Sequence, residues 1–538
     1  MILTIFIMKL TSKTILGTLV FITFSFWVKA ADETYDICIY GGTSAGVIAA
    51  YTAKTMGKSV VLIAPDGHIG GLSSGGLGQT DIGNKFAIGG ISREFYKKLG
   101  QVYGQAEAWK FEPKEAMKVF KGYLASAQIP VIYHKRIKKI NKKNNVIQSV
   151  QLVDTYSRQE NKQQITAKIF IDCTYEGDLF PLAGISYTVG REDNTVYQET
   201  LNGYQLAQYL KQSGRHQFPD GVSPYRIPNN PSSGLVYGVS KAQPSTTGKG
   251  DGHVQAYNFR ICLTDSAENR IPITRPADYD SSKYELLARL FKAQPNMVQP
   301  NDYFIWSRMP NHKTDINNRG GFSTDMIGAN YSWPEANFKE RKKIFEDHVS
   351  YTKGLLYFII SDPRVPKKLS DFVKQWGYPK DEYIESDHFT PQLYIREGRR
   401  MIGSYVMTER NCIGKEVVAD PIGMAAYTMD SHNVQRIVVN GMVKNEGNVE
   451  VGKFPPYPIA YRAITPKQKE CANLLVPVSL SASHIAFGSI RMEPVFMLLG
   501  QSAGVAAVQA IDQHQAVQQI DYQKLKEELL KQKQILAL

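Results

Sequence analysis

Tyr35-Asp36-Ile37-Cys38-Ile39-Tyr40-Gly41-Gly42-Thr43-Ser44-Ala45-Gly46 is the stretch on which the prediction of the fold depends. Its first half is a compact, largely apolar run typical of a buried strand, and its second half is a glycine-containing turn. A helical pattern follows over Val47–Met56, and Ser59–Ala64 is a second run of the buried-strand type. A strand, turn, helix and strand within about thirty residues is the context that a dinucleotide-binding unit requires.

The turn, G-G-T-S-A-G, is a variant of the dinucleotide fingerprint. A glycine at the end of the strand permits the tight turn, a last glycine lets helix and strand approach closely, and the helix N–H groups face a pyrophosphate. Thr43 stands at the middle position, where glycine usually allows the closest phosphate approach. Such turns also serve simple packing, but their place in a βαβ unit favours cofactor binding. The predicted cofactor-binding residues here are Gly41, Gly42, Thr43, Ser44, Ala45 and Gly46.

The end of the second strand departs from the dinucleotide pattern. An acid is expected there to bind the ribose hydroxyls of the adenosine, and Ala64 stands in its place. Asp66, two residues on, is a candidate substitute. The alternative is that Asp66 is an ordinary turn residue between Pro65 and Gly67.

The segments that follow favour FAD over NAD. Gly70-Gly71 and a long glycine-rich continuation suit a flavin that runs along an extended loop, and Leu72 is included as a contact. Near the other end of the chain, Gly488–Pro494 leads into a helix whose N–H groups would face the flavin pyrimidine oxygen. The alternative is a terminal helix whose glycines only allow close packing. The candidate cofactor residues in that helix are Gly500, Gln501 and Gly504.

Composition excludes several classes of protein. The 538 residues are 43% apolar and 21% charged, which fits a soluble globular protein. The net charge is +13, but the lysines are spread without a dense basic motif interleaved with aromatics, so we predict no nucleic-acid partner. The cysteines are far apart and form no CxxC pair, so we predict no zinc site, iron–sulfur cluster or other metal site.

The first thirty residues have the layout of a secretory signal peptide. A mostly apolar stretch, Thr14–Val28, follows Lys9 and Lys13 and ends at Val28-Lys29-Ala30. We therefore predict a signal peptide over 1–30, export to the periplasm or the medium, and no stable membrane insertion after cleavage. The alternative is a retained N-terminal anchor.

Four segments carry a resemblance to a known family. They are Ile39–Gly46, His68–Gly71, Asp172–Leu179 and Ser483–Gln501. With them the chain resembles exported bacterial proteins of the "FAD dependent oxidoreductase" family, over nearly all of its mature length. That family is distantly similar to the flavin subunit of heterodisulfide reductase, and some of its members are labelled xanthan lyase. The resemblance implies an FAD cofactor, a contact from Asp178 and a glycan setting; the clustered cysteines that would hold iron–sulfur clusters are missing here.

The predicted fold class is α/β, with a Rossmann-like FAD-binding domain of the glutathione-reductase type and an inserted α+β substrate domain. Strand-like runs at Pro130–His134, 146–153 and 164–173 predict a third strand and a β-meander. Residues from about 195 to 385 change in character and are rich in Pro, Asn and Tyr. We therefore divide the mature chain into 31–195 and 386–538, the two parts of the FAD-binding domain, and 196–385, the substrate domain.

A flavin that oxidises a C–H bond beside O–H or N–H needs a base for one proton, and histidine is suited to this near neutral pH. His484, just before the proposed flavin-facing helix, is the first candidate, followed by His432 and His388. A lone histidine is more often a structural, hydrogen-bonded residue. Three arginines would hold an anionic substrate or reduced flavin, or else pair with Glu397 or Glu493: Arg399, Arg400 and Arg491.

The predicted function is hydride transfer between noncovalent FAD and a polar small molecule, such as a saccharide or sugar acid, with a glycan as the larger alternative. Trp306, Trp333 and Trp376 would stack on sugar rings if exposed, and belong to the core if buried. Two other functions stay open at this point: a redox-neutral FAD-containing lyase or isomerase, and a noncatalytic carbohydrate-binding protein. The sequence names no electron acceptor.

Overall fold

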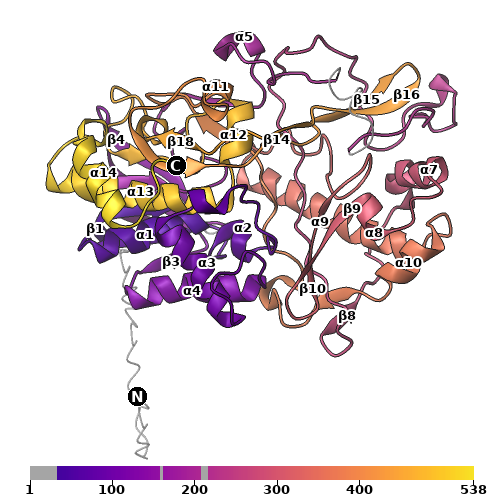
Figure 1. The fold of residues 1–538 in the computed structure, drawn as a ribbon, viewed down its shortest axis with the longest axis horizontal. Coiled ribbons are helices and arrows are strands. Elements are labelled where there is room, and N and C mark those ends of the chain that lie inside the picture. Colours follow the sequence, from indigo (N-terminus) through magenta and orange to yellow (C-terminus); the bar gives the residue numbers. More distant parts are fainter. Residues whose placement is uncertain (1–32, 158–161, 207–215) are drawn as a thin grey trace, which may run out of the picture.

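The computed structural model describes residues 33–157, 162–206 and 216–538. The predicted signal peptide, residues 1–30, lies outside the described residues. Figure 1 shows two lobes side by side. One contains the N-terminal and C-terminal parts of the chain, in indigo and yellow, and the other is built mainly from its middle part.

A seven-stranded sheet forms the centre of the first lobe, in the order β3-β2-β1-β6-β5-β4, with β19 also paired to β6. The pairs among β3, β2, β1 and β6 are parallel, whereas β4, β5 and β6 pair antiparallel and form the predicted meander. The α/β prediction is therefore confirmed. The strands are β1 (Glu33–Tyr40), β2 (Val60–Ala64), β3 (Val131–Tyr133), β4 (Lys135–Lys143), β5 (Val146–Asp154), β6 (Gln163–Asp172) and β19 (Leu474–Leu475).

The second half of strand β1, Ile37–Tyr40, is buried on both faces, which explains its continuous apolar sequence. Ile37 and Ile39 belong to the core that also contains the helices α1 (Ser44–Thr55) and α13 (Glu493–Asp512). Cys38 and Tyr40, on the other face, pack in a second core with residues of β5 and β6. This alternation follows from the two-residue period of a strand.

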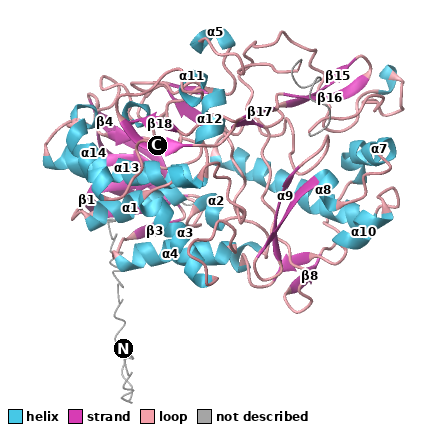
Figure 2. Ribbon diagram, viewed as in Figure 1, coloured by secondary structure: helices cyan, strands magenta, loops and turns pink. Residues whose placement is uncertain are grey.

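Helices cover the sheet and place the C-terminal part of the chain against the N-terminal part (Figures 1 and 2). Helix α13 is long and apolar enough to span a membrane, but 94% of its apolar window is buried inside the protein, so it is a core helix. The remaining helices of this lobe are α2 (Gly71–Ser74), α3 (Gly90–Val102), α4 (Pro113–Ser126), α11 (Glu409–Cys412), α12 (His484–Ile490) and α14 (Tyr522–Lys531).

The second lobe combines helices with short antiparallel strand pairs (Figure 2). Its apolar side chains, among them Phe291 and Trp376, belong to the same continuous core as α1 and α13. Its helices are α7 (Glu285–Ala293), α8 (Pro300–Tyr303), α9 (Phe338–Ser361) and α10 (Lys367–Val373), and its strands include β8 (Arg270–Pro272), β9 (Phe304–Met309), β10 (Lys313–Asn318) and β11 (Gly377–Pro379).

A hairpin from the later part of the chain joins this second lobe. Strands β15 (Gln435–Val439) and β16 (Met442–Glu446) pair with each other, and Asn445 and Val443 bond to the segment 216–222. The other short pairs are β7 (Tyr187–Val189) with β12 (Arg399–Met401), β13 (Pro421–Ala425) with β18 (Tyr457–Ala460), and β14 (Met429–Ser431) with β17 (Val449–Val451). A short helix, α5 (Asn194–Tyr197), precedes the segment 200–206.

Candidate functional site

The turn between β1 and α1 is closed so tightly that two of its positions require glycine. Gly41 has a φ of 114°, and a Cβ there would lie 2.7 Å from the carbonyl carbon of Cys173. A Cβ on Gly46 would lie 2.0 Å from the carbonyl oxygen of Gly41. Since these contacts are with backbone, no rotation of a side chain relieves them. The glycines therefore bring the start of α1 directly against the ends of β1 and β6.

Thr43, which replaces the usual middle glycine, caps α1. Its Oγ1 accepts from the Gly46 N–H and donates to the Cys173 carbonyl, at 3.2 and 2.8 Å. Helix α1 therefore begins at Ser44, three residues earlier than the predicted Val47. The first N–H groups of a helix have no acceptor within it, so those of Ser44 and Ala45 can bind an anion.

A cavity of about 360 Å³ opens beside this turn, within the size range of cofactor pockets. Asp66, two residues after the end of β2, lines it, and helix α9 of the second lobe contributes Phe338, Arg341 and Phe345. Further lining residues come from the turn, from the segment after β6, from the segment 391–395 and from three other places in the chain: Gly41, Gly42, Thr43, Gly71, Thr155, Tyr175, Asp178, Trp333, Leu393 and Ile395.

Two lining atoms fit a bound cofactor. Thr155 Oγ1 and Trp333 Nε1 are shielded from solvent and have no hydrogen-bond partner among the described residues. Buried polar atoms are normally bonded, so these two donors call for a ligand atom in the cavity. Together with the anion-binding helix start and the exposed carboxylate of Asp66, they suit the phosphate, ribose and base of a dinucleotide.

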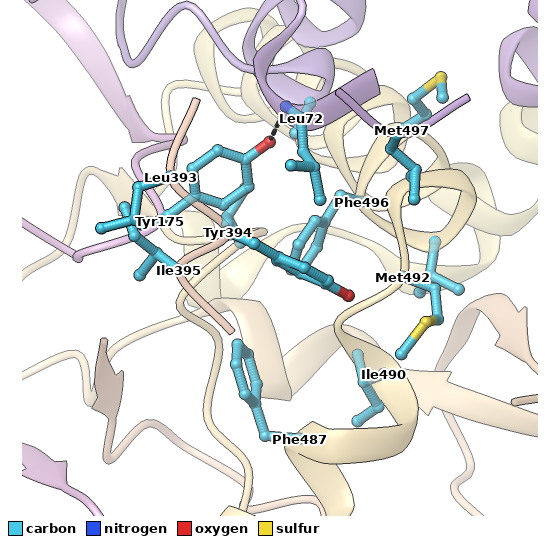
Figure 3. Close-up of a cluster of buried hydrophobic side chains, with 14 of the residues drawn as sticks. Leu72, Tyr175, Leu393, Tyr394, Ile395, Phe487, Ile490, Met492, Phe496 and Met497 are labelled. Atoms are coloured by element: carbon cyan, nitrogen blue, oxygen red, sulfur yellow. Dashed lines mark hydrogen bonds between the residues drawn. The ribbon is translucent and has the colours of Figure 1, made fainter. Parts of the chain in front are cut away.

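The second predicted glycine segment supports the cavity wall. Gly70 donates its N–H to the Gly42 carbonyl at 2.7 Å, which holds the loop beside the turn. The Leu72 N–H donates to the Tyr175 hydroxyl at 2.9 Å, and the Leu72 side chain joins an apolar cluster (Figure 3). Neither Gly70 nor Leu72 lines the cavity, whereas Gly71 does.

Asp178 lines the cavity but is already paired. Its carboxylate accepts from Arg341 at 2.7 Å and from Arg399 at 2.9 Å. Burial opposes ionisation, and the two guanidinium groups outweigh it, so the pKa of Asp178 lies below its ordinary value. Arg399, predicted to hold an anionic substrate, instead forms this pair and a second one with Glu335.

The prediction that Gly500, Gln501 and Gly504 of the terminal helix contact the cofactor is corrected. A Cβ on Gly500 would lie 2.4 Å from the Ala45 carbonyl oxygen, and one on Gly504 would lie 2.9 Å from that of Ala49. Both glycines therefore serve the close contact of α13 with α1. Gln501 accepts from the Ile91 N–H and donates to Gln532. None of the three lines the cavity, because this part of α13 faces its neighbouring helices.

Glu493, the first residue of α13, is a site residue that sequence reasoning missed. The sequence suggested it only as an ion-pair partner of the three candidate arginines. Its buried carboxylate accepts hydrogen bonds from Ser44 Oγ, Ser73 Oγ and Tyr175 Oη, at 2.6, 2.8 and 2.6 Å. Burial nonetheless raises its pKa above the ordinary value, against the effect of these bonds. Glu493 therefore ties the start of α13 to the start of α1.

An extended segment connects the cavity with a buried polar cluster. Leu393 and Ile395 line the cavity, and Figure 3 shows them with Tyr175 in an apolar cluster. The alternate residues Tyr394 and Arg396 bond instead to Arg491 and to Asp325. We define the polar cluster as Gln255, Asp325, Tyr394, Arg396, Glu397, Arg400, Asp430, Ser431, His432, His484 and Arg491.

His484, the first candidate base, is buried and bonded at both ring nitrogens. Nδ1 lies 2.7 Å from Glu397 Oε2, and Nε2 lies 3.0 Å from Ser431 Oγ. His484 and Arg400 outweigh the effect of burial and lower the pKa of Glu397 to about 2. The charged Glu397 carboxylate accepts the Nδ1 proton, and in the neutral form of the imidazole Nε2 is then the acceptor that faces the Ser431 hydroxyl.

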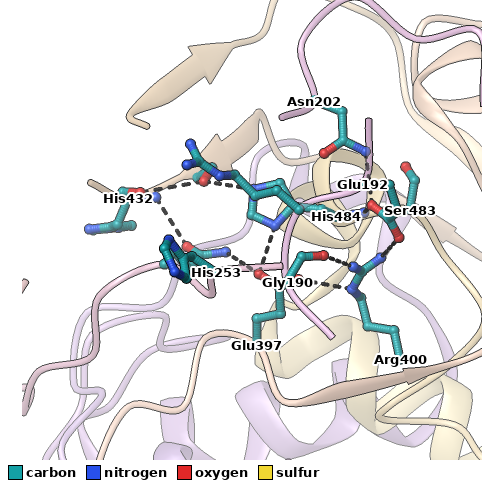
Figure 4. Close-up of polar contacts among 12 residues, drawn as sticks. Gly190, Glu192, Asn202, His253, Glu397, Arg400, His432, Ser483 and His484 are labelled. Atoms are coloured by element: carbon teal, nitrogen blue, oxygen red, sulfur yellow. Dashed lines mark hydrogen bonds and ion pairs between the residues drawn. The ribbon is translucent and has the colours of Figure 1, made fainter. Parts of the chain in front are cut away.

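His432, the second candidate, lies in the same cluster (Figure 4). Its Nδ1 lies 2.9 Å from Asp325, and its Nε2 lies 3.6 Å from Asp430. Burial and Arg396 lower its pKa, but the two carboxylates outweigh them and raise it above the ordinary value. His432 is therefore held as a cation more firmly than an ordinary histidine.

The remaining candidates divide between the cluster and other places. Arg491 belongs to the cluster, where it bonds to Tyr394 and Asp430. Arg400 forms ion pairs with Glu397 and Glu192; the pair with Glu397 is the alternative that the sequence offered for this arginine. His388 does not belong to the cluster; its Nδ1 lies 3.2 Å from the Glu382 carbonyl oxygen.

The three tryptophans of the predicted insertion are buried. Trp306, Trp333 and Trp376 are 7%, 6% and 2% exposed. They are core residues, and the idea that they stack on a glycan at the surface is wrong for this structure. Within 33–157, 162–206 and 216–538, no group of His, Cys, Asp and Glu side chains could hold a metal ion, and the five cysteines are buried and unpaired.

The sequence profile of the family described as "FAD dependent oxidoreductase" matches residues 36–529. The chain belongs to this family and is an FAD-dependent oxidoreductase with FAD as its cofactor. No curated protein matches it at a significant level.

The chain is similar over about a third of its length to three solved structures of other proteins. Anhydrotetracycline hydroxylase OxyS from Streptomyces rimosus is 10% identical with a TM-score of 0.24, covering 30% of this chain and 36% of that one. L-proline dehydrogenase from P. horikoshii is 17% identical with a TM-score of 0.20, covering 31% and 26%. THI4 from Thermovibrio ammonificans is 18% identical with a TM-score of 0.24, covering 31% and 71%. The matches thus span less than two thirds of the first two of these chains.

Proposed function

We propose that this enzyme oxidises a polar small molecule, of the saccharide or sugar-acid class, by hydride transfer to noncovalently bound FAD. The observation that carries the proposal is the buried polar cluster behind the cavity wall. Two of its donors, Arg396 Nε and Arg491 Nε, are buried without an acceptor within 33–157, 162–206 and 216–538. Such donors suit the oxygen atoms of a hydroxylated substrate.

The cavity residues would hold the cofactor. The N–H groups at the start of α1 would bind its phosphates, Asp66 a ribose, and Thr155 and Trp333 further polar atoms. FAD, when bound, supplies a two-electron acceptor for the hydride. The chain's own groups must then bind the substrate, orient it and receive one proton.

The two histidines of the polar cluster are suited to different tasks. His484 keeps Nε2 as an acceptor, so it can take a proton through Ser431, while charged Glu397 stabilises the imidazolium that forms. His432, held as a cation by Asp325 and Asp430, would stabilise negative charge on a substrate oxygen. We propose His484 as the proton acceptor and His432 as the electrostatic partner.

Anaerobic mixing of the purified enzyme with sugars and sugar acids tests the proposal. A substrate should bleach the flavin absorbance in the wild type. His484→Gln should keep the yellow colour and reduce the flavin about 100-fold more slowly, since general bases contribute at least this much. His312→Gln is the matched control, because that histidine is 71% exposed on the second lobe.

Two outcomes would contradict the proposal in different ways. If no sugar or sugar acid reduces the flavin, the substrate class is wrong. If a substrate is found and His484→Gln reacts at the wild-type rate, the role of His484 is wrong. Loss of colour in the variant would show a binding defect, so flavin content is measured first.

A further inference from the structure

A second cavity, of about 190 Å³, lies in the second lobe next to the polar cluster. At about 30 Å³ for each water molecule, it has room for roughly six waters or for a small organic molecule. Asp325 lines it and also bonds to His432, so the cavity adjoins the polar cluster directly. Its walls are mainly aromatic and aliphatic: Tyr237, Phe322, Met326, Ile327, Ala329 and Tyr351.

Arg436, on β15, is the charged group that distinguishes this cavity. It is 4% exposed, and its guanidinium carbon lies 5.4 Å from the ring centre of Phe218 and 5.0 Å from that of Phe322. Nε donates to Asn445 Oδ1 and Nη2 to the Gly321 carbonyl oxygen. These two hydrogen bonds fix the guanidinium in place, but both acceptors are neutral. Among the described residues, no carboxylate forms an ion pair with Arg436.

The other buried arginines of the described ranges are all paired with acids. A buried charge is costly unless an opposite charge accompanies it, so the lack of an acidic ion-pair partner at Arg436 needs an explanation. Burial accordingly lowers the pKa of Arg436 to about 10. The paired arginines are Arg191, Arg260, Arg341, Arg396, Arg399, Arg400 and Arg491.

The unbonded end of this guanidinium faces a glycine of the cavity wall. Nη1 has no acceptor in the part of the chain that the structure describes, and a Cβ added to Gly238 would lie 3.1 Å from it. Gly238 itself lines the cavity. A side chain at position 238 would therefore cover Nη1, and glycine leaves it open to a ligand.

We propose that the second cavity binds the carboxylate of a small organic acid, with Arg436 as its anion-binding residue. A guanidinium whose position is fixed by Asn445 and Gly321 presents its N–H groups in the planar arrangement that matches a carboxylate. The aromatic walls suit the carbon body of the acid. Asp325, which also lines the cavity, forms its ion pairs with Arg396 and His432 and not with Arg436. The proposal concerns binding and does not depend on the redox reaction.

Titration calorimetry with three matched pairs tests it: D-glucuronate with D-glucose, lactate with 1,2-propanediol, and benzoate with benzyl alcohol. At least one acid should bind to the wild-type holoenzyme more tightly than its neutral partner. Arg436→Met should weaken that binding about 10- to 100-fold, as expected for hydrogen bonds to a charged group. Arg436→Lys should retain part of it, since the charge remains and the planar fork is lost.

Two further variants keep the test independent of folding defects. Ala329→Leu fills the cavity without touching the guanidinium and should also abolish binding. Arg275→Met is the matched control, because Arg275 also lies over an aromatic ring, that of Tyr279, but at an exposed position outside the cavity. It should bind the acid as the wild type does.

The inference is overturned if no acid of the panel binds, if the neutral partners bind equally well, or if folded Arg436→Met binds like the wild type. Flavin reduction measured on the same samples separates this inference from the proposed function. Arg436-dependent binding without flavin reduction would leave the carboxylate site standing and count against the proposed function. Flavin reduction by a sugar, together with acid binding that Arg436→Met leaves unchanged, would support the proposed function and overturn the carboxylate site.

Discussion

Replacing Gly500 with alanine should loosen the contact between α13 and α1 and so weaken both the fold and the cofactor site. The added Cβ would lie 2.4 Å from the Ala45 carbonyl oxygen and 2.9 Å from the Ala45 Cα. Ala45 belongs to the first turn of α1, directly after Thr43, which lines the cavity. Because both contacts are with backbone, one helix must move away from the other.

The expected magnitude comes from two opposing effects. Alanine gains about 1 kcal/mol over glycine inside a helix. Overpacking costs about 1–3 kcal/mol, and the upper end applies where the clash is with backbone. The net loss in the free energy of unfolding should therefore be about 2 kcal/mol, which corresponds to roughly a 30-fold change in the ratio of folded to unfolded protein.

Gly122 provides the matched control. It lies in the middle of α4, and a Cβ there would have no atom within 4 Å. Gly122→Ala should therefore stabilise the protein by about 0.5–1 kcal/mol. Denaturant unfolding followed by circular dichroism measures both variants, and flavin content is measured on the same preparations. If Gly500→Ala is as stable as Gly122→Ala and retains full flavin, the close contact between α13 and α1 is not required for the fold or for the cofactor site.

Three further outcomes are expected. Asp66→Asn, which can keep the turn bond to the His68 N–H, should weaken FAD binding about tenfold in a flavin fluorescence titration, and unchanged affinity would assign Asp66 to the turn alone. Glu397 has a pKa of about 2 against an ordinary 4.5, so it stabilises the fold above pH 4.5 by about 3 kcal/mol and loses this effect as the pH falls towards 2. Acid unfolding of the wild type should accordingly be steeper in that window than that of Glu397→Gln; equal slopes would exclude the ion pair. Finally, N-terminal sequencing of the protein secreted by a bacterial host should begin at Ala31, and an uncleaved chain would favour the anchor.

The sequence predicted the parts of the fold that short-range patterns determine. The first strand, its glycine turn and the second strand follow one another within a single βαβ unit, and the structure confirms them. The meander was also predictable, because its strands are neighbours in the chain. Strand β4 was not predicted as a strand, since Lys135–Lys143 alternates lysines with few apolar residues, and only pairing with β5 reveals it.

The role of the terminal helix could not be settled from its glycines. Gly500 and Gly504 are four residues apart, a spacing that serves a helix–helix contact as well as a cofactor contact. The choice depends on which element lies opposite, and that element, α1, is more than four hundred residues away in the chain. The tryptophans posed the same difficulty, because burial is decided by packing partners that a local pattern does not name.

The polar cluster was the least predictable part, and its construction explains why. His432 and Asp325 are 107 residues apart, and His484 and Glu397 are 87 apart, so each histidine looks isolated in the sequence. What joins them is one extended segment, 393–397. Its apolar members Leu393 and Ile395 face the cavity, while the residues between and after them bond to the cluster. Residues 393 to 396 alternate between the two, as the side chains of an extended segment do, and Glu397 then also bonds to the cluster, so the same backbone positions the cavity wall and the polar cluster.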